Sequence, residues 1–444
     1  MLPPVPGIAD NGDFGKLLGR YGLGSGQTFV YANTRFFYAD QYRYRSGFTS
    51  SELLLIAPAL AIHRVISKSG FFDVRIMGAV HASLFLLAVF LFAPLVDSAV
   101  TGLLALLMFT DFMYAGFFNC FYMDPASLLF TLLAAVFYLR AMRWRGPADS
   151  VALAVSILLA VLSKSQYAIL GPWFALLLWT GRDFLAGGRK TIAAAALVVL
   201  ASTWVSYRYL TPAGYEDKAA FTVIFSQILP ASSHPDRALA ELGLDGTYRR
   251  FIGMQAYTPG VPLDEPAFHA DFHRKTSFRK IAAFYLRHPA DAWSALRSAL
   301  DEAGRFQSPL GNFDSGSGRP PAARYESFQL VSGLKRRIFY RHGARLLAWS
   351  AALAVLLPVL LERHRSRLPE GALWGGSVLS AMALSTLIVS ALADVYDQFR
   401  HEVVAFALFD MVLLTLAWLA LTSSGRPQFQ KRWPAPFRAR PDSD

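Results

Sequence analysis

The chain has 444 residues, of which 54% are hydrophobic and only 17% are charged, and its mean hydropathy is +0.34. Soluble domains usually carry about 25% charged residues, so this composition excludes a disordered chain, a coiled coil and a disulfide scaffold, and it argues against an ordinary soluble enzyme. The net charge of +12 would suggest nucleic-acid binding in a soluble chain, and the single cysteine, Cys120, excludes an internal disulfide and a multi-cysteine metal site.

Long apolar runs predict helices that cross a membrane, because a spanning helix needs about 20 mostly apolar residues. A further apolar stretch, 146–185, is interrupted by Ser163-Lys164-Ser165-Gln166 and fits either one long pass or two short ones. The uninterrupted runs lie at 71–95, 98–117, 124–140, 190–207, 343–361, 371–391 and 402–422.

The basic residues between these runs indicate an orientation. They gather at 140–145, 181–190 and 363–367 and in the tail, 423–444, and the positive-inside rule makes all four segments cytoplasmic. Two cytoplasmic segments on either side of 146–185 require an even number of crossings. We therefore expect two passes there, 146–166 and 167–185, with Lys164 at the outer turn.

The predicted fold is an all-α polytopic integral membrane protein with about nine transmembrane helices and a cytoplasmic C-terminus, placed in the inner (cytoplasmic) membrane. Because the basic residues are scattered among cytoplasmic loops, the net charge is an orientation signal and we expect no nucleic-acid partner. This topology puts the N-terminus outside, yet residues 1–50 contain no signal peptide. We hypothesise that one helix precedes this sequence in the natural protein; the alternative is that the first helix inserts with its N-terminus outward.

Two segments are predicted to lie outside the membrane on the extracytoplasmic side. The first is a head, 1–70, in which 51–64 is too short to span comfortably and fits a helix in the plane of the interface. The second is a mixed, mostly helical insert, 208–342, whose Gly- and Pro-rich loop 311–321 is a candidate hinge or lid.

Ionisable residues concentrate in the outer halves of the predicted helices. His81, Asp111 and Asp410 lie deepest, and such residues in spanning helices are costly and often functional. We favour an outer-side functional cavity as their explanation; structural ion pairs between helices are the alternative.

The head holds a compact group of charged and aromatic residues. Asp10-Asn11-Gly12-Asp13 predicts a tight turn that presents two carboxylates. A carboxylate at the membrane surface can deprotonate an acceptor hydroxyl or bind a cation. The run 38–45 adds tyrosines that can stack on sugars and arginines that can bind phosphate. The alternative is an ordinary turn with Tyr and Arg anchored at lipid headgroups.

With these residues in view, the layout resembles the GT-C superfamily of membrane glycosyltransferases, which use polyprenyl-phosphate-linked sugars on the extracytoplasmic side. Residues 10–16 resemble the acidic first outer loop of bacterial members, 121–128 a short outer loop that opens a helix, and 398–410 a late outer loop of bacterial hexose-transferase relatives. The first transmembrane helix of the superfamily has no counterpart in this sequence.

The resemblance implies transfer of a sugar from a polyprenyl-phosphate donor to a cell-envelope glycan, lipid or protein acceptor. Asp13, or failing that Asp10, is implied as the general base. Members of the superfamily differ in whether they need a divalent metal, and the sequence leaves that choice open. The implied substrate-binding residues are cations for the leaving phosphate, Arg43, Arg45, Lys164 and Arg400, and groups that orient sugar hydroxyls, Asp124, Asp397 and His401.

The main alternative is a transporter or flippase of a lipid-linked sugar or another solute. Transporters commonly place ionisable or helix-breaking residues near the membrane midplane in paired halves. Here these residues lie to one side and a sizeable insert interrupts the helices, which favours an enzyme.

Overall fold

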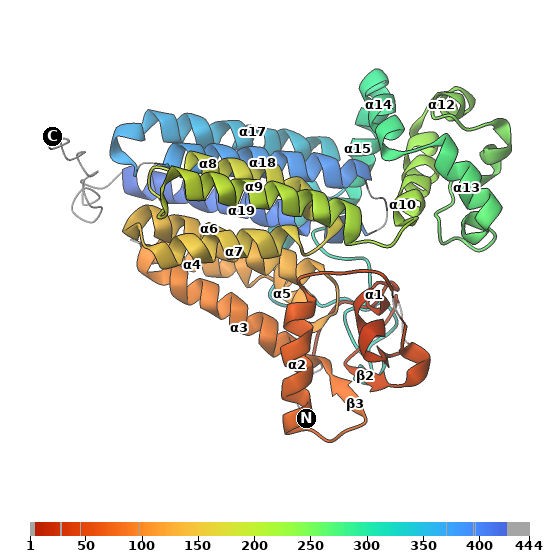
Figure 1. Ribbon diagram of the computed structural model, residues 1–444, viewed down its shortest axis with the longest axis horizontal. Coiled ribbons are helices and arrows are strands. Elements are labelled where there is room, and N and C mark those ends of the chain that lie inside the picture. Colours follow the sequence, from red (N-terminus) through yellow and green to blue (C-terminus); the bar gives the residue numbers. More distant parts are fainter. Residues whose placement is uncertain are drawn as a thin grey trace.

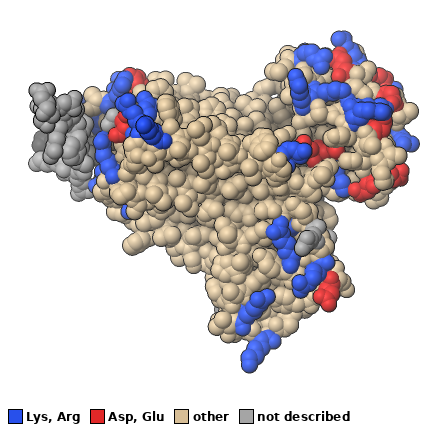
Figure 2. Space-filling view, in the orientation of Figure 1, with Lys and Arg blue, Asp and Glu red and all other residues tan. Residues whose placement is uncertain are grey.

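The computed structural model describes residues 5–26, 29–44, 46–96, 98–369, 371–393, 395 and 397–423. A bundle of long helices carries both the N-terminal head and the insert at the same end (Figure 1). Lys and Arg also cluster at the opposite end of the bundle (Figure 2), where the connections 140–145, 181–190 and 363–367 are basic. The orientation of the bundle in a membrane remains a prediction from these charges.

Six helices of the described chain are long and apolar enough to span a membrane. A seventh candidate is a helix pair bent by 46°, made of Ala99–Phe109 and Phe112–Asn119. The bend follows from Asp111, whose side chain accepts from the backbone N–H of Met113 (3.0 Å) and so starts a new helix inside an apolar run. The six are α3 with its terminal turn (Val74–Leu95), α6 (Asp124–Trp144), α9 (Gly188–Tyr209), α17 (Gly343–Arg363), α18 (Ala372–Ala393) and α19, whose apolar part is Gln398–Leu421.

Counting helices by length and apolar composition gives fewer spans in the described chain than the nine or so predicted. The stretch 146–185 does form two helices, α7 (Pro147–Val161) and α8 (Leu170–Thr180), separated by a short turn η5 (Ser165–Ile169). These helices have 15 and 11 residues, so they fall short of a full span. The polar residues at 163–166 shorten both helices, which the count of apolar residues does not anticipate.

The head combines short helices with a small sheet. Its strands β1 (Leu23–Gly24), β2 (Arg35–Tyr38) and β3 (Phe71–Asp73) are antiparallel, with Phe36 opposite Phe72, so the fold is not purely α. Helix α1 (Gly15–Leu18) packs near this sheet, and β3 leads directly into α3. Helix α2 (Leu53–Ile66) lies across the direction of the bundle helices (Figure 1), the orientation predicted for a helix in the membrane interface.

The insert is built from short helices around an aromatic core that includes Phe221, Phe225, Phe251 and Phe272. Its last long helix, α15, packs on α17, α18 and α19 and so joins the insert to the bundle. The insert helices are α10 (Tyr215–Val223), the π-helix η6 (Ile224–Ile228), α11 (Leu229–Ala231), α12 (Pro235–Glu241), α13 (Pro266–Lys275), α14 (Phe278–Arg287), α15 (Pro289–Ala303) and α16 (Leu330–Phe339).

The loop 311–321, a candidate hinge or lid from its sequence, is tied to the head by backbone hydrogen bonds. Gly311 accepts from Ala9 (2.9 Å) and donates to Phe29 (3.0 Å), and Asn312 accepts from Gly7 (3.0 Å). A Cβ at Gly311 would lie 2.0 Å from the Val30 carbonyl oxygen, so this close approach requires glycine.

The deepest ionisable residues all have partners on other segments, as the alternative of structural pairs expects, while the outer-side functional cavity stays a prediction. Asp111 accepts from the Ser332 hydroxyl (2.6 Å) and from two backbone N–H groups at the start of α16. Asp410 accepts from Tyr114 (2.7 Å) and pairs with Lys335 (2.5 Å), again on α16. His81 pairs with Glu52 (2.8 Å), which links α3 to the start of α2.

We predict that Asp410→Leu destabilises the protein by about 3–5 kcal/mol, because it leaves Lys335 without its buried partner. The double change Asp410→Leu with Lys335→Met should recover much of that loss, since it removes both charges. Chemical unfolding in detergent measures both effects. Breaking the exposed pair Arg237–Glu241 is the control and should cost under about 1 kcal/mol. Equal losses in the single and double variants would contradict the pairing.

Candidate functional site

A group of charged residues lies where the head meets the bundle. It draws on the turn 10–16, the start of α6, the turn 163–167 and the start of α19. Segments hundreds of residues apart in sequence therefore share one site.

The turn that presents Asp13 is built by its own side chains. One oxygen of Asp10 accepts from the N–H groups of Gly12 (2.7 Å) and Phe14 (3.1 Å), and Asn11 accepts from the N–H of Asp13 (3.2 Å). Gly12 has φ of +100°, a conformation that favours glycine. These bonds direct Asp13 toward the bundle, so Asp10 shapes the turn while Asp13 faces the other charges.

Both oxygens of Asp13 contact cations. Oδ1 lies 2.5 Å from Lys16 Nζ, one turn later along the chain, and Oδ2 lies 2.8 Å from Arg400 Nη1. The Asp13 side chain is 24% exposed and the Lys16 side chain 18%. Lys164 is similarly exposed, at 15%, so Asp13, Lys16 and Lys164 are the members of the group that solvent reaches.

Arg400 is the centre of the buried part. Its guanidinium lies 3.7 Å from Asp124 and 3.6 Å from Asp397, and it covers the Tyr122 ring at 4.4 Å. The Tyr122 hydroxyl donates to the Ala9 carbonyl (2.7 Å) and accepts from the N–H of Asn11 (3.1 Å). Tyr122 therefore holds both the arginine and the turn that carries Asp13.

Asp124, at the first position of α6, connects Arg400 to a second cation. Its Oδ1 accepts from Lys164 Nζ (3.0 Å) and from the Tyr167 hydroxyl (3.0 Å). Lys164 in turn lies 3.3 Å from His401 Nδ1. The shared carboxylate makes Lys164, Asp124 and Arg400 one continuous polar network.

This network leaves buried polar atoms unsatisfied. Within the described residues, Asp124 Oδ2, Asp397 Oδ1 and Arg400 Nε have no hydrogen-bond partner. Glu402, two residues after Arg400 on α19, is fully buried. Neither of its carboxylate oxygens has a hydrogen-bond partner in the described chain. Buried polar atoms are normally paired, so the unsatisfied atoms around Arg400 fit a site that receives a polar ligand or water.

The charges shift the acidity of the groups outside the helices. Burial alone would raise the pKa of Asp13, but Lys16 and Arg400 offset this and hold the pKa well below its usual range. Burial raises the pKa of Asp10 to about 6, against the opposing effect of its two backbone hydrogen bonds. Burial also raises the pKa of Asp397, although Arg400 opposes it. Asp10 and Asp13, three residues apart in one turn, therefore have pKa values shifted in opposite directions.

The structure brings together Asp13, Asp124, Lys164, Asp397, Arg400 and His401 from the predicted site. Asp10 lies in the same turn, but its carboxylate is bound to backbone N–H groups. Arg43 is not in the group: its side chain is 65% exposed and its nearest acidic partner is Asp40, at 3.7 Å. Arg45 lies outside the described residues.

Sequence reasoning missed Lys16, Tyr122 and Tyr167. The contact of Lys16 with Asp13 could have been predicted, because a lysine three residues after an aspartate on a helical turn can reach it. Tyr122 and Tyr167 carry no such local signal, since each acts on a residue from a distant segment.

A divalent metal does not fit this arrangement. In the ranges that the structure describes, no three His, Cys, Asp or Glu side chains are placed to hold one. The carboxylates of Asp13, Asp124 and Asp397 each face a side-chain cation instead, so Arg400, Lys16 and Lys164 occupy the positions a metal would need.

Comparison with known proteins gives one family and one solved structure. The family model described as the YfdI N-terminal transmembrane domain matches residues 1–432. No curated protein matches the chain. The archaeal oligosaccharyltransferase AglB from Archaeoglobus fulgidus, solved with an inhibitory peptide and a dolichol-phosphate, is similar with a TM-score of 0.36 and 16% identity. The match covers 96% of this chain and 49% of AglB, so the chain spans about half the length of that protein. That similarity is too low to assign a fold or an activity.

The pKa of Asp10 is raised and that of Asp13 is lowered, so replacing each by Asn should change the stability of the protein in opposite directions. The folded-state pKa of Asp10, about 6, lies above its ordinary value of 3.8, so ionisation of Asp10 costs stability in full above pH 6, and this cost fades between pH 6 and pH 3.8. Asp10→Asn should therefore raise stability at pH 8 by about 1–2 kcal/mol and by about half as much at pH 5. Asp13→Asn should lower the unfolding midpoint at both pH values, because the lowered pKa of Asp13 contributes stability throughout this range. Thermal unfolding in detergent measures both, and a loss of stability in Asp10→Asn at pH 8 would contradict the assignment.

Proposed function

We propose that this chain, which belongs to the YfdI N-terminal transmembrane domain family, is a membrane glycosyltransferase that moves a sugar from a polyprenyl-phosphate donor to a cell-envelope acceptor. The acceptor is a glycan, lipid or protein on the side of the membrane that the head and the insert face. The observation that carries the proposal is the group in which one partly exposed carboxylate, Asp13, lies against fixed cations.

The reaction needs two kinds of group, and the site offers both. A base accepts the proton of the acceptor hydroxyl while its oxygen bonds to the anomeric carbon of the sugar. The bond from that carbon to the phosphate oxygen breaks, and the polyprenyl phosphate leaves with the bonding electrons. Asp13 is the proposed base, since its side chain is partly exposed and faces the cations, whereas Asp124 and Asp397 are fully buried.

Negative charge grows on the leaving phosphate, so fixed cations near it lower the barrier. Arg400 and Lys164 are held by Asp124, and Lys16 lies beside Asp13. A planar guanidinium such as that of Arg400 can bind two phosphate oxygens at once. The proposed role of Asp397 and His401 is to orient sugar hydroxyls, and burial would keep water from competing for these groups.

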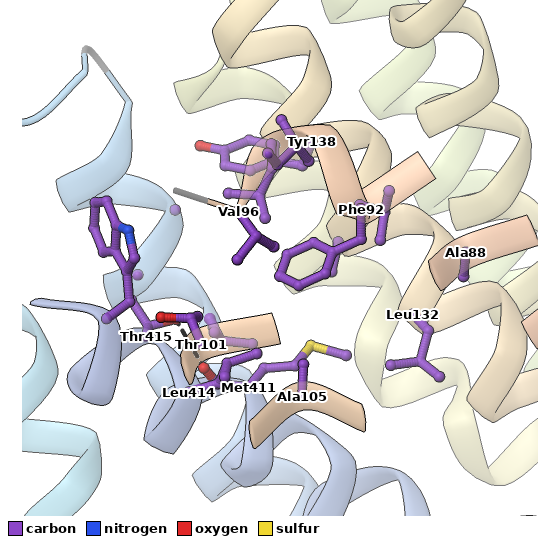
Figure 3. Close-up of a pocket in the computed structure, with 18 of the residues that line it drawn as sticks. Ala88, Phe92, Val96, Thr101, Ala105, Leu132, Tyr138, Met411, Leu414 and Thr415 are labelled. Carbon is purple, nitrogen blue, oxygen red and sulfur yellow. Dashed lines mark hydrogen bonds between the residues drawn. The ribbon is translucent and has the colours of Figure 1, made fainter. Parts of the chain in front are cut away.

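An apolar cavity in the bundle supports a donor with a long hydrocarbon chain. It has a volume of about 530 Å³ and lies among α3, α4 (Ala99–Phe109), α6, α18 and α19. Leu132, Ala105 and Met411 line it from three of these helices (Figure 3). On α6 its wall extends from Thr131 to Met142, so it begins about 10 Å and ends about 27 Å along the helix from Asp124. A chain whose phosphate lies near Asp124 could therefore extend toward this cavity.

Loss of the base is the first test. Asp13→Asn should lower transfer by about 10²–10⁴-fold, because the amide cannot accept the proton. The assay incubates membranes that contain the protein with a panel of polyprenyl-phosphate sugars and follows loss of each donor by mass spectrometry. Lys275→Gln, which breaks an ion pair in the insert far along the chain, is the control and should transfer normally.

If no donor is consumed by the folded wild type, the transferase proposal is wrong. Movement of the lipid-linked sugar across liposomes without any acceptor would then favour the transporter. If donor is consumed but Asp13→Asn retains near-normal turnover, the base is not Asp13 and Asp10 is the next candidate.

The role of Arg400 predicts a graded series. Arg400→Lys keeps the charge but loses the second phosphate contact, so we expect transfer to fall by about tenfold to a hundredfold. Arg400→Gln also leaves Asp397 buried without its cation and Asp124 with Lys164 alone, and we expect both activity and stability to fall further. Equal activity in the two variants, measured on folded protein, would contradict a phosphate role.

A further inference from the structure

The free site holds its proposed base in a clamp of two cations. Lys16 binds one oxygen of Asp13 and Arg400 binds the other. A carboxylate with both oxygens paired to cations is a weak proton acceptor, because protonation would break favourable contacts. The two ion pairs that hold Asp13 at the site therefore also hinder it from accepting the proton of the acceptor hydroxyl.

The same cations are the ones a phosphate would seek. The group contains four carboxylates, Asp10, Asp13, Asp124 and Asp397, and three basic side chains, Lys16, Lys164 and Arg400. With all of them ionised, the formal charge is +3 − 4 = −1, so the free site has no surplus positive charge for an anion. An arriving phosphate must compete with a carboxylate.

Exposure decides which carboxylate yields. The side chains of Asp124 and Asp397 are fully buried, whereas Asp13 and Lys16 are 24% and 18% exposed. An anion that enters from solution therefore reaches Asp13 and its partner Lys16 before it reaches either buried carboxylate. Lys16 also donates to the Tyr215 hydroxyl (3.2 Å) and lies over the Phe48 ring at 4.9 Å, so it stays in position when its acidic partner changes.

We propose, building on the function proposed above, that the lipid-linked phosphodiester takes Lys16 and Arg400 away from Asp13 and thereby turns Asp13 from an ion-pair partner into a proton acceptor. Lys16 is then a positioning residue that couples donor binding to the base. In the absence of donor, Asp13 does not take the acceptor proton.

The coupling has a thermodynamic consequence. Lys16 and Arg400 hold the pKa of Asp13 low in the free protein, so loss of these contacts raises it. At a pH between the free and bound values, donor binding takes up a proton, and affinity for the donor rises as pH falls through that window. The other titratable groups around Asp13 are Asp10, Asp124, Asp397, Lys164, His401, Tyr122 and Tyr215.

Calorimetry on the full chain in detergent can count this proton. The probe is farnesyl methyl phosphate, a phosphodiester with one charge that does not titrate in the range used and no sugar to transfer. Binding is measured near pH 5 in two buffers of different ionisation enthalpy. We expect uptake of about one proton per ligand and an affinity that rises by up to about tenfold per pH unit of acidification.

Variants identify the group that takes the proton. Asp13→Asn should abolish the uptake and bind the probe about tenfold more tightly, because the phosphate no longer displaces a carboxylate. Lys16→Gln should reduce the uptake, since the clamp is already half open, while Lys16→Arg and the control Lys275→Gln should behave as the wild type. Asp10→Asn should retain the uptake.

The proposal is wrong if the wild type binds the probe without proton uptake or does not bind it. It is also wrong if Asp13→Asn binds the probe as tightly as the wild type or more weakly. It is also overturned if Asp10→Asn abolishes the uptake. Because the probe carries no sugar, this test is independent of transfer. If the probe binds with proton uptake but no sugar donor is consumed, the proposed displacement of Asp13 is supported and the glycosyltransferase proposal is not. If sugar is transferred but the probe binds without proton uptake, the glycosyltransferase proposal is supported and the displacement of Asp13 is not.

Discussion

The burial of Arg400 is the interaction on which the rest of this structure depends. An arginine at the start of an apolar helix, with 4% of its surface exposed, is costly unless its charge is balanced. The balance comes from Asp13 in the head, Asp124 on α6 and Asp397 just before α19. Since one of these partners belongs to the head, the head must sit on the end of the bundle for the charge to be neutralised. The same contact thus positions a domain and builds a site.

The molecule uses its buried ionisable residues in two ways, and hydrogen bonding distinguishes them. Asp410 and Asp111 have partners on both carboxylate oxygens, and each has at least one partner on α16, so they secure that helix to the bundle. Asp124 and Asp397 each keep one oxygen without a hydrogen bond within the described chain. Complete pairing is typical of a structural role, whereas an incompletely satisfied polar group beside a partly exposed carboxylate is typical of a place that receives a ligand.

The prediction of helices from apolar runs succeeded and the prediction of their lengths did not. Every predicted run contains a helix, and 146–185 forms two helices, α7 and α8, while their crossing of the membrane stays a prediction. Fewer helices of full spanning length than predicted are found in the described chain, because Ser163 to Gln166 and Asp111 interrupt helices that a count of apolar residues treats as continuous. The loop 311–321 reads as flexible from its glycines, yet Gly311 is needed there for close packing against the head.

The sequence by itself determined a multi-pass helical membrane protein, the places where its chain leaves the bundle, and most residues of the candidate site. Apolar length, loop charge and the Asp10-Asn11-Gly12-Asp13 turn act locally, so they can be read along the chain. Only the tertiary structure decided which charges meet. It paired Asp13 with Arg400 across 387 residues, placed Asp410 opposite Lys335, and left Arg43 outside the group. The reason is that a buried charge is stabilised by partners within a few ångströms, and those distances are fixed by packing between segments that are far apart in the chain.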